Sequence, residues 1–400
     1  MSDFTDADAL AIERCRAASL ALLERNLAPQ GILAASRSAP AEARRYTRIF
    51  GRDAAICALA MCGSGVAALE HGAVASLDAL AAQQAANGQI AKYVDPSGQD
   101  ADFWYLGCID ATLWWLIAAD HLRRASPVAG TSQRWAGSIE RALGWLLAQE
   151  HQRLRLLQQN EASDWADIMP RSGYVLYANA LWHEVERRFG LEGAGATRHH
   201  FNHLFHPFRR DLPDYHRARL LRHYARRGRR DPGLYLSFVN FAVWGDEGDV
   251  FGNLLAILCG LADEAMGHRI VHTISAAKAD DPLPIRVVLH PLERGHELWR
   301  PYMARHRQNH PQQYHNGGAW PFVGGFWVLA LARLGLRGRA WQALAALADA
   351  NARDDWRFTE WFHGTTQAAL GMPGQSWNAA TFILAHRQLT QGDAGVLGAR

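Results

Sequence analysis

The sequence predicts an all-α fold, a toroid of paired helices with functional loops at one end. Segments rich in Ala and Leu alternate with loops rich in polar and aromatic residues along all 400 residues. The chain shows no βα alternation of the kind that builds a parallel sheet. No linker divides it, so we expect one domain over residues 1–400. An α-solenoid is the competing architecture, and no fixed repeat period favours it.

The spacing of apolar residues predicts where the helices lie. The first helix is expected at residues 5–26, where Ala9, Ile12 and Cys15 share one face. Residues 90–102 are expected to form a loop, and residues 234–244 and 285–289 are candidate short strands. The further predicted helices are 54–61, 66–86, 110–124, 132–149, 174–189, 251–266, 325–334, 340–352 and 375–389.

Composition excludes several classes of protein. With 49% apolar residues the chain can bury a large core, and it has no disorder signature. The net charge is +3, and the densest basic run, residues 217–230, contains Tyr224 as its one aromatic residue. That run favours a solvated helix face over a nucleic-acid surface. No stretch approaches ~18 uninterrupted apolar residues, so no membrane span is expected.

The cysteines and histidines predict neither a disulfide framework nor a metal site. The five cysteines are odd in number and scattered, which is typical of reduced core residues. The histidines lack a ligand spacing such as His-Glu-x-x-His, so we expect no metal and no cofactor. The acidic N-terminus has no apolar segment typical of a secretory signal. These features together predict a cytoplasmic protein.

Residues 161–182 hold the strongest candidate for a catalytic acid. Glu161, Asp164 and Asp167 surround Trp165, and an apolar run follows. An apolar wall disfavours an ionised carboxyl, so the group can keep a proton near neutrality and deliver it to a leaving group. The residues alone leave Asp164 open as an alternative to Asp167. Asp164 is more typical of a solvent-facing cap or turn. Arg171, just beyond, can orient a carboxylate or bind substrate.

Two early loops carry groups suited to sugar hydroxyls. Arg52 and Asp53 stand side by side at the predicted start of a helix. The carboxylate accepts hydrogen bonds from hydroxyls, and the guanidinium donates them. The alternative for Asp53 is a helix N-cap with a surface Arg beside it. Asp110 also precedes a helix, and the same two interpretations apply to it.

Three later loops are unusually polar and aromatic. Residues 314–321 combine two glycines with His315, Asn316 and Trp320, which can supply donors and a stacking face. Residues 358–364 place Glu360 among aromatic side chains, where an ionisable group is expensive to bury without a purpose. The last helix opens with Gln375 and Trp377, further candidates for sugar contacts.

Together these stretches resemble the glycoside hydrolases built on an (α/α)6 barrel. The most similar groups are the glucosidase domain of glycogen-debranching enzymes (amylo-α-1,6-glucosidase) and the neutral/alkaline invertases. In those families an Arg-Asp pair binds the terminal sugar, which here is Arg52 with Asp53. A Trp-x-Asp motif carries the general acid, here Asp167. A Glu late in the barrel is the general base, here Glu360.

The two groups divide the resemblance between them. Residues 170–173 and 179–182 are closer to the debranching glucosidases, whereas residues 251–257 and 314–321 are closer to the invertases. The chain departs from both at His363, where an acidic residue is usual, and in its Arg-rich middle.

The resemblance implies an exo-acting, inverting hydrolase that cleaves a glucosidic bond in an oligosaccharide or small glycoside. Asp167 would protonate the glycosidic oxygen and Glu360 would take a proton from water on the opposite face of the ring. An amylo-α-1,6-glucosidase-like activity is the first expectation, and an invertase-like sucrose hydrolase is the alternative. A non-catalytic sugar-binding barrel and a sugar epimerase, which would use paired His, also remain open. The residues expected to hold the substrate are Arg52, Asp53, Asp110, Trp165, Arg171, His315, Asn316, Trp320, Gln375 and Trp377.

Overall fold

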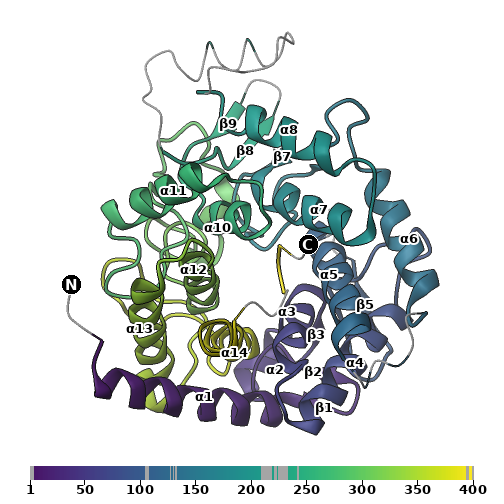
Figure 1. The fold of residues 1–400 in the computed structure, drawn as a ribbon, viewed down its shortest axis with the longest axis vertical. Helices are drawn as coiled ribbons and strands as arrows, with labels where there is room; N and C mark the ends of the chain where they lie inside the picture. The colour runs from purple at the N-terminus through teal and green to yellow at the C-terminus, as the bar shows by residue number, and fades with distance from the viewer. Residues whose placement is uncertain are drawn as a thin grey trace.

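Six helices form a closed inner ring within the described part of the chain (Figure 1). The structure is a computed structural model that describes residues 4–103, 108–126, 133–208, 233–240, 243–392 and 396–398, with positions 128, 130, 219 and 223. Each inner helix contacts the next, and the last contacts the first. They are α3 (Gly51–Met61), α5 (Ile109–Ala125), α7 (Leu176–Phe189), α10 (Val250–Leu258), α12 (Pro321–Arg333) and α14 (Ser376–Gln391).

A second layer of helices surrounds this ring, and the chain alternates between the two layers. Helix α4 packs on α3, α6 on α5, α8 on α7, α11 on α10, α13 on α12, and α1 on α14. This closed double layer is the (α/α)6 barrel that the resemblance implied, so the expected fold class is confirmed. The outer helices are α1 (Asp6–Asn26), α4 (Ala67–Ala82), α6 (Ala136–Leu147), α8 (Ala194–Leu204), α11 (Glu264–Ala276) and α13 (Arg337–Trp356).

Burial explains which helices lie inside. Every residue of α3 except Arg52 is buried, as expected for a helix covered on all sides. Helix α1 instead buries Ile12, Cys15, Ser19 and the residues that continue this face, at intervals of three and four. The remaining face of α1 is exposed to solvent, which places it in the outer layer.

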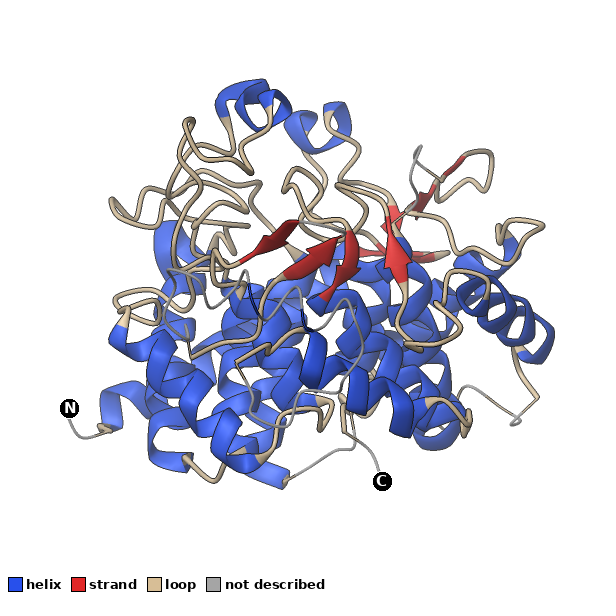
Figure 2. Ribbon diagram, turned by 90° about the horizontal axis from the view of Figure 1, so that it is seen from above, coloured by secondary structure: helices blue, strands red, loops and turns tan. Residues whose placement is uncertain are grey.

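Short antiparallel strands and the longest loops gather on one side of the helices (Figure 2). The three sheets pair β1 (Leu27–Ala28) with β2 (Gly31–Ile32), join β3 (Ile49–Phe50), β4 (Tyr93–Val94) and β5 (Ala101–Asp102), and join β6 (Gln158–Gln159), β7 (Gly173–Val175), β8 (Phe238–Asn240) and β9 (Val243–Gly245). Register aligns Phe50 with Tyr93 and Tyr174 with Val239. Strands β3 and β7 lead directly into the inner helices α3 and α7, which places these strands at the same end of the barrel.

Some predicted elements are wrong in extent. The single helix expected at residues 251–266 is two helices, because Gly260 adopts φ +73° after α10 and Asp263 caps α11 by accepting from Met266 N. The loop expected at residues 90–102 contains β4 and β5, and residues 285–289 form isolated bridges, not a strand. The basic run at residues 217–230 lies outside the described residues except at positions 219 and 223, as does the aromatic segment 104–107.

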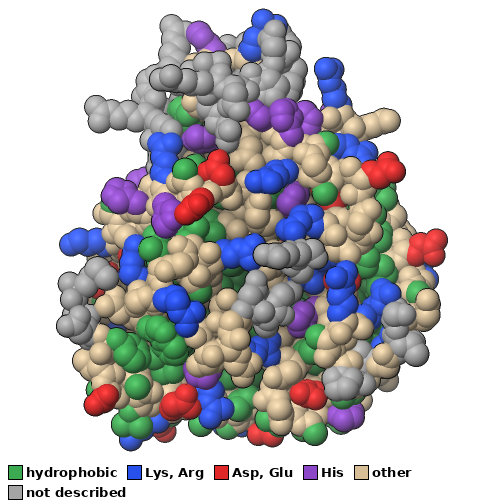
Figure 3. Space-filling view, viewed as in Figure 1, with side chains coloured by type: hydrophobic (Ala, Val, Ile, Leu, Met, Phe, Trp, Pro, Cys, Tyr) green, Lys and Arg blue, Asp and Glu red, His purple; other side chains and the backbone are tan. Residues whose placement is uncertain are grey.

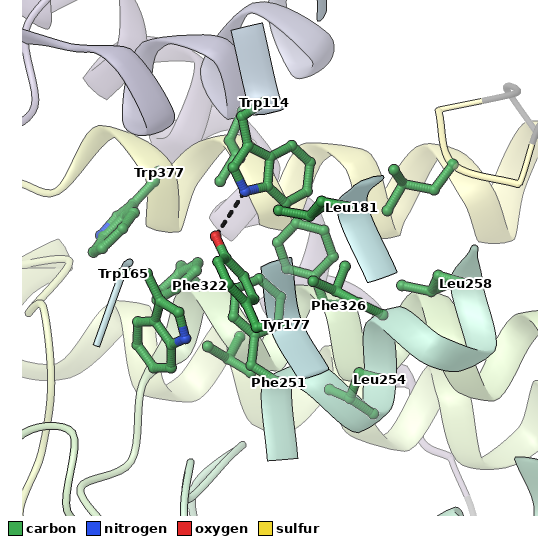
Figure 4. Close-up of a cluster of buried hydrophobic side chains, with 14 of the residues drawn as sticks. Trp114, Trp165, Tyr177, Leu181, Phe251, Leu254, Leu258, Phe322, Phe326 and Trp377 are labelled. Carbon is green, nitrogen blue, oxygen red and sulfur yellow. Dashed lines mark hydrogen bonds between the residues drawn. The ribbon is translucent and has the colours of Figure 1, made fainter. Parts of the chain in front are cut away.

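A cluster of aromatic side chains fills the centre of the barrel beneath the converging loops (Figure 4). Trp114 Nε1 donates to the hydroxyl of Tyr177 at 2.8 Å. Phe322 stacks on Trp377 with ring centroids 3.9 Å apart. Aromatic side chains bury a large apolar area, and pairs of rings prefer particular orientations. This cluster therefore supports the loops that lie above it.

The other end of the barrel is closed by a short C-terminal segment. Arg188, in the last turn of α7, donates to the carbonyl of Val396 at 2.7 Å. Gly398 N donates to the carboxylate of Glu184 at 3.2 Å, and Val396 and Leu397 are buried. The two ends of the ring therefore differ: this segment covers one, and the converging loops form the other.

The surface and the cysteines match a compact helical protein. Lys and Arg side chains are spread over the face shown in Figure 3 and are interspersed with Asp, Glu and His. All five cysteines are buried and free. None of the described helices combines the length and apolarity that crossing a membrane requires.

Replacement of Gly325 by Ala is expected to destabilise the barrel by about 1–3 kcal/mol, because a Cβ there would overpack the α12–α14 contact. That Cβ would lie 2.5 Å from Thr381 Cβ and 2.8 Å from its carbonyl oxygen. Gly144, in α6, is the matched control, since its Cβ would meet no atom within 4 Å. Gly144→Ala should stabilise by about 0.5–1 kcal/mol. Thermal or denaturant unfolding checks both, and equal midpoints for the two variants would contradict the packing argument.

Candidate active site

A cavity of about 210 Å³ at the loop end of the barrel collects side chains from distant parts of the chain. It brings together both predicted catalytic carboxylates, Asp167 and Glu360. Six of the predicted substrate-binding residues line the same cavity, here called the inner pocket. They are Arg52, Asp53, Trp165, His315, Trp320 and Trp377.

Four predicted substrate-binding residues do not line the inner pocket. Asp110, Asn316 and Gln375 are completely buried, and Arg171 is 1% exposed. Asn316 joins two loops, because its Oδ1 accepts from Leu292 N at 2.7 Å and its Nδ2 donates to Leu292 O at 2.9 Å. These side chains are placed to support the pocket wall from behind.

The first turn of α3 presents Arg52 and Asp53. The helix starts three residues earlier than predicted, and its N-cap position is Phe50, so the N-cap interpretation of Asp53 is wrong. Gly51 allows this start, because a Cβ there would lie 2.5 Å from the carbonyl oxygen of Ala91. Gly51 N donates to Lys92 O at 2.8 Å. This close approach brings the residues around β4 to the same pocket.

Arg52 is held between two carboxylates. Its Nη1 donates to Asp110 Oδ2 at 3.1 Å, and its Nη2 lies 3.3 Å from Asp53 Oδ2. The N-cap of α5 is Cys108, so Asp110 is not the cap that the alternative interpretation proposed. Asp110 also accepts from the hydroxyl of Tyr177 at 3.0 Å. Its role in the described structure is to fix Arg52 from below.

The loop between β6 and β7 carries the candidate acid. Asp164 is buried, with Oδ1 accepting from Ala166 N at 2.8 Å and Oδ2 accepting from Gln159 Nε2 at 2.9 Å. The predicted turn role of Asp164 is correct, but its predicted exposure to solvent is wrong. The turn directs the next carboxylate, Asp167, into the pocket, where its side chain is 34% exposed.

Arg171 anchors the far end of that loop to the barrel. Its Nε donates to Glu247 Oε1 at 3.0 Å, and its Nη1 lies 3.2 Å from Asp249 Oδ1. Burial raises the pKa of Asp249 to about 6, against the lowering effect of Arg171. Two roles were predicted for Arg171, orienting a carboxylate or binding substrate, and these contacts favour the first. The loop that bears Asp167 is thereby fixed to the N-terminus of α10.

Burial raises the pKa of Asp167 above its usual value, and neighbouring charges modify that effect. Lys92 and Arg52 lower this pKa, with Lys92 Nζ 3.8 Å from Oδ2, while Asp110 raises it. His315 Nδ1 lies 3.6 Å from Asp167 Oδ1. Burial, with Arg52 next, holds the pKa of His315 well below its usual value, so the ring is neutral. A carboxyl that tends to retain a proton is suited to proton donation.

Glu360 lies in the loop between α13 and α14 and accepts two hydrogen bonds. Tyr46 OH donates to Oε1 at 2.8 Å, and Met372 N donates to Oε2 at 3.1 Å. Burial raises the pKa of Glu360 to about 7, although these two donors lower it. Asp53 and Asp167 raise it further by repulsion. A carboxylate with a pKa near neutrality is a stronger base than an ordinary Glu.

The three indoles line the pocket in different ways. Trp320 Nε1 donates to Tyr314 O at 2.9 Å, and its ring stacks on His315. Trp165 Nε1 and Trp377 Nε1 are buried and have no hydrogen-bond partner in the described structure. The guanidinium of Arg52 lies 5.4 Å from the ring centre of Trp377. The pocket wall therefore offers aromatic rings to a ligand.

Sequence reasoning missed Tyr46, Lys92, Tyr93 and Tyr314 as pocket residues. Tyr46 stands six residues before Arg52 in the same stretch, so a search around the Arg-Asp pair had access to it. Lys92 is one of only two lysines in the chain, which is a compositional signal. Tyr93 and Lys92 belong to a segment interpreted as an ordinary loop, and only the pairing of β3 with β4 brings them to the site.

No group of three or more His, Cys, Asp or Glu suited to a metal ion occurs among the residues that the structure describes. The inner pocket instead combines two carboxyl groups, both with raised pKa values, with Arg52 and several aromatic rings. This set can donate one proton, accept another, and hold a ligand rich in hydroxyl groups.

Comparison with protein families gives a match over part of the chain. Residues 249–392 match the family described as alkaline and neutral invertase. A neutral/alkaline invertase 1 from Oryza sativa subsp. japonica is 29% identical over 137 residues, which are 33% of this chain and 21% of the relative. Alkaline/neutral invertase E of Arabidopsis thaliana is 31% identical over 142 residues, 34% of this chain and 22% of the relative. The match thus spans about a fifth of these curated relatives.

Solved structures share the whole architecture at low identity. A GH63 mannosylglycerate hydrolase from Thermus thermophilus, in complex with glucose, has a TM-score of 0.64 and 14% identity, covering 93% of this chain and 100% of that one. The glucoamylase of Hormoconis resinae has a TM-score of 0.64 and 12% identity, covering 99% and 76%. The chain therefore shares its fold with these glycosidases, and its residues 249–392 are similar to the alkaline and neutral invertases.

Proposed function

We propose that the chain is an exo-acting, inverting glycoside hydrolase with Asp167 as general acid and Glu360 as general base. The observation that carries this proposal is that the inner pocket holds both carboxyl groups, each with a raised pKa, beside Arg52 and Asp53. A cavity of about 210 Å³ suits one terminal sugar ring better than a continuous polymer chain, which supports exo action.

Each pocket group has a defined task in this mechanism. Asp167 protonates the glycosidic oxygen as the bond to the anomeric carbon breaks. Glu360 takes a proton from a water molecule that attacks the opposite face of the ring, and Tyr46 fixes the carboxylate through its hydrogen bond. Inversion requires roughly 6.5–9.5 Å between the two carboxyl groups, which leaves room for that water. Arg52 and Asp53 hold hydroxyls of the terminal ring, with Asp110 securing Arg52.

A sucrose-type small glucoside is the preferred substrate class. The segment that matches the invertases, residues 249–392, includes Glu360 and the pocket residues His315 and Trp320. The motifs closer to the debranching glucosidases supply buried contacts: Arg171 binds carboxylates, and Asn179 donates to Leu157 O and Val175 O. An amylo-α-1,6-glucosidase activity is therefore the second candidate, since its motifs do not line the pocket.

A substrate panel followed by NMR of the product tests the proposal. Sucrose, isomaltose, an α-1,6-branched oligosaccharide and aryl glucosides would be incubated with the protein, and the anomer released first would be recorded. We expect β-glucose from an α-glucoside. Release of α-glucose would overturn the inverting mechanism. Binding of a saccharide without turnover would favour a non-catalytic sugar-binding barrel, and conversion to an epimer would favour the epimerase.

The pKa of Glu360 predicts how the rate depends on pH when only the base titrates. An Asp167→Asn variant acting on α-glucosyl fluoride isolates this step, because fluoride departs with little help from an acid. Glu360 must be ionised, so kcat/KM should rise with pH and level off above a midpoint near 7. In the unmodified pocket the charge of Asp167 raises the pKa of Glu360. The variant lacks this charge, so its midpoint should lie slightly below the pKa of Glu360 in the unmodified pocket.

The matched variant for this profile adds Tyr46→Phe. Tyr46 donates to Glu360 and lowers its pKa, so its removal should shift the midpoint to higher pH. A midpoint near the ordinary Glu value of about 4.3, unmoved by Tyr46→Phe, would contradict the assignment of Glu360 as a buried base.

A further inference from the structure

A second, larger cavity adjoins the inner pocket. It has a volume of about 560 Å³ and is here called the outer cavity. Arg44, Tyr46 and Glu360 line both spaces, so the two are contiguous. In an exo-acting enzyme the terminal ring fills the inner pocket. The rest of the substrate then extends into the neighbouring space, which makes the outer cavity a candidate for recognition of that part.

The outer cavity is cationic at its rim. Arg44 and Arg307 line it and are both exposed, and among its described lining residues Glu360 carries the one carboxyl group. Arg45, nearby in the inner pocket, differs from them, because it donates to Tyr93 OH at 2.7 Å and has Asp100 and Asp102 in its surroundings. The charges of Arg44 and Arg307 are thus available to a ligand.

The remaining lining suits a small organic group. Trp361 forms an apolar wall, and Leu370 is 46% exposed, an unusual degree for a large apolar side chain beside a polar site. Gln308 and Gln313 add amide groups that can donate or accept hydrogen bonds. An apolar wall, amides and two guanidinium groups fit a short carbon skeleton that bears hydroxyls and a negative charge.

Some of the non-glycine residues with left-handed conformations line the two cavities or neighbour their lining residues. Arg45, Arg307, Gln312 and Tyr314 all adopt left-handed conformations, with φ of 63°, 53°, 67° and 43°. Non-glycine residues in this region cost of order 1 kcal/mol or more and cluster at ligand-binding sites. The chain therefore accepts strain where it shapes the rim that carries Arg307.

We propose that the outer cavity binds an anionic leaving group, a carboxylate or phosphate attached to the glycoside whose terminal ring occupies the inner pocket. Guanidinium groups match both anions through paired N–H donors. This inference rests on the proposed glycosidase function and specifies its substrate class: the preferred substrates are glucosides of hydroxy acids or of phosphorylated sugars, ahead of their neutral counterparts.

Matched substrate pairs test this preference. The α-glucosides of lactate and of propane-1,2-diol differ only in a carboxylate against a hydroxymethyl group. Sucrose 6′-phosphate and sucrose form the second pair. We expect kcat/KM to be about tenfold higher for the charged member of at least one pair at low ionic strength, and the ratio to fall as salt screens the exposed guanidinium groups. The pair that shows the preference identifies the anion.

Arg307→Gln should lower the preference while leaving turnover of the neutral substrates near that of the unmodified protein, because Arg307 lines the outer cavity and not the inner pocket. The double variant Arg44→Gln/Arg307→Gln should remove the preference. Arg25→Gln is the matched control, since Arg25 is an exposed arginine of α1 that lines neither cavity. It should keep the preference. Equal kcat/KM within both pairs, or a preference that survives the double variant, would overturn the inference and leave the glycosidase proposal standing.

Binding separates the two proposals if no glycoside is turned over. The Asp167→Asn variant keeps the outer cavity intact, because Asp167 does not line it. Calorimetric titration of this variant with the same four compounds should give tighter binding of the charged members. Equal affinity within each pair, or no binding of any compound, would overturn the anionic site. Absence of turnover by the unmodified protein with tighter binding of the charged members would overturn only the catalytic proposal.

Discussion

Glu360→Gln is expected to lower kcat by about 10²–10⁴-fold on every glycoside that the protein cleaves, α-glucosyl fluoride included. The amide keeps the size of the side chain and can still accept from Tyr46, but its NH2 group cannot accept the bond that Met372 N donates to the carboxylate. It cannot take a proton from water at neutral pH. Because the base is needed whatever the leaving group, an activated substrate does not restore the rate. Steady-state kinetics with sucrose and with α-glucosyl fluoride provide the measurement.

A companion variant tests whether the loss is chemical. In Glu360→Ala a space replaces the carboxylate, and azide can enter it and attack the anomeric carbon without a base. Azide should therefore restore turnover of α-glucosyl fluoride and give β-glucosyl azide. Glu161→Gln is the control carboxylate, since Glu161 accepts from Arg300 and Tyr302 and does not line the inner pocket. Near-normal turnover in Glu360→Gln, with an unchanged unfolding midpoint, would remove Glu360 from the mechanism.

Asp167→Asn is expected to lower kcat by about 10²–10⁴-fold on sucrose-type glycosides and far less on α-glucosyl fluoride. A sugar or alcohol leaving group needs a proton as the bond breaks, whereas fluoride departs with little protonation. The contrast between the two substrates is therefore the signature of a general acid. The measurement compares the fold-decrease in kcat on sucrose with the fold-decrease in kcat on α-glucosyl fluoride.

The outcome for Asp167 also discriminates between the two carboxylates of the same loop. Asp164 accepts from Ala166 N and Gln159 and is buried away from the pocket lining. Asp164→Asn should reduce activity on both substrates equally, through displacement of the loop. An Asp167→Asn variant that lost activity on the fluoride as strongly as on sucrose would show that Asp167 positions the substrate and does not protonate it.

Much of the fold could be predicted because local sequence patterns indicate the helices of the barrel. Inner helices such as α3 and α12 are long runs of apolar residues, and the outer helix α1 buries one face, so helices could be recognised between the polar loops. The short strands were harder to predict, since β4 and β5 have two residues each and β4 also pairs with β3, which is distant in the sequence. A helix predicted across Gly260 also failed, because a single glycine in a left-handed conformation ends it.

The chemical groups could be recognised in the amino-acid sequence: Asp167 beside Trp165, Glu360 among aromatic residues, and the Arg52–Asp53 pair at a helix start. Which of these groups share a cavity, and which support it, depends on the three-dimensional packing of the helices. Closure of the helical ring brings positions 52, 167 and 360 to one pocket, while Asp110 and Arg171 pass behind it. The raised pKa of Glu360 arises from burial and from Asp53 and Asp167 nearby. Such values depend on distances across the barrel, which local sequence does not encode.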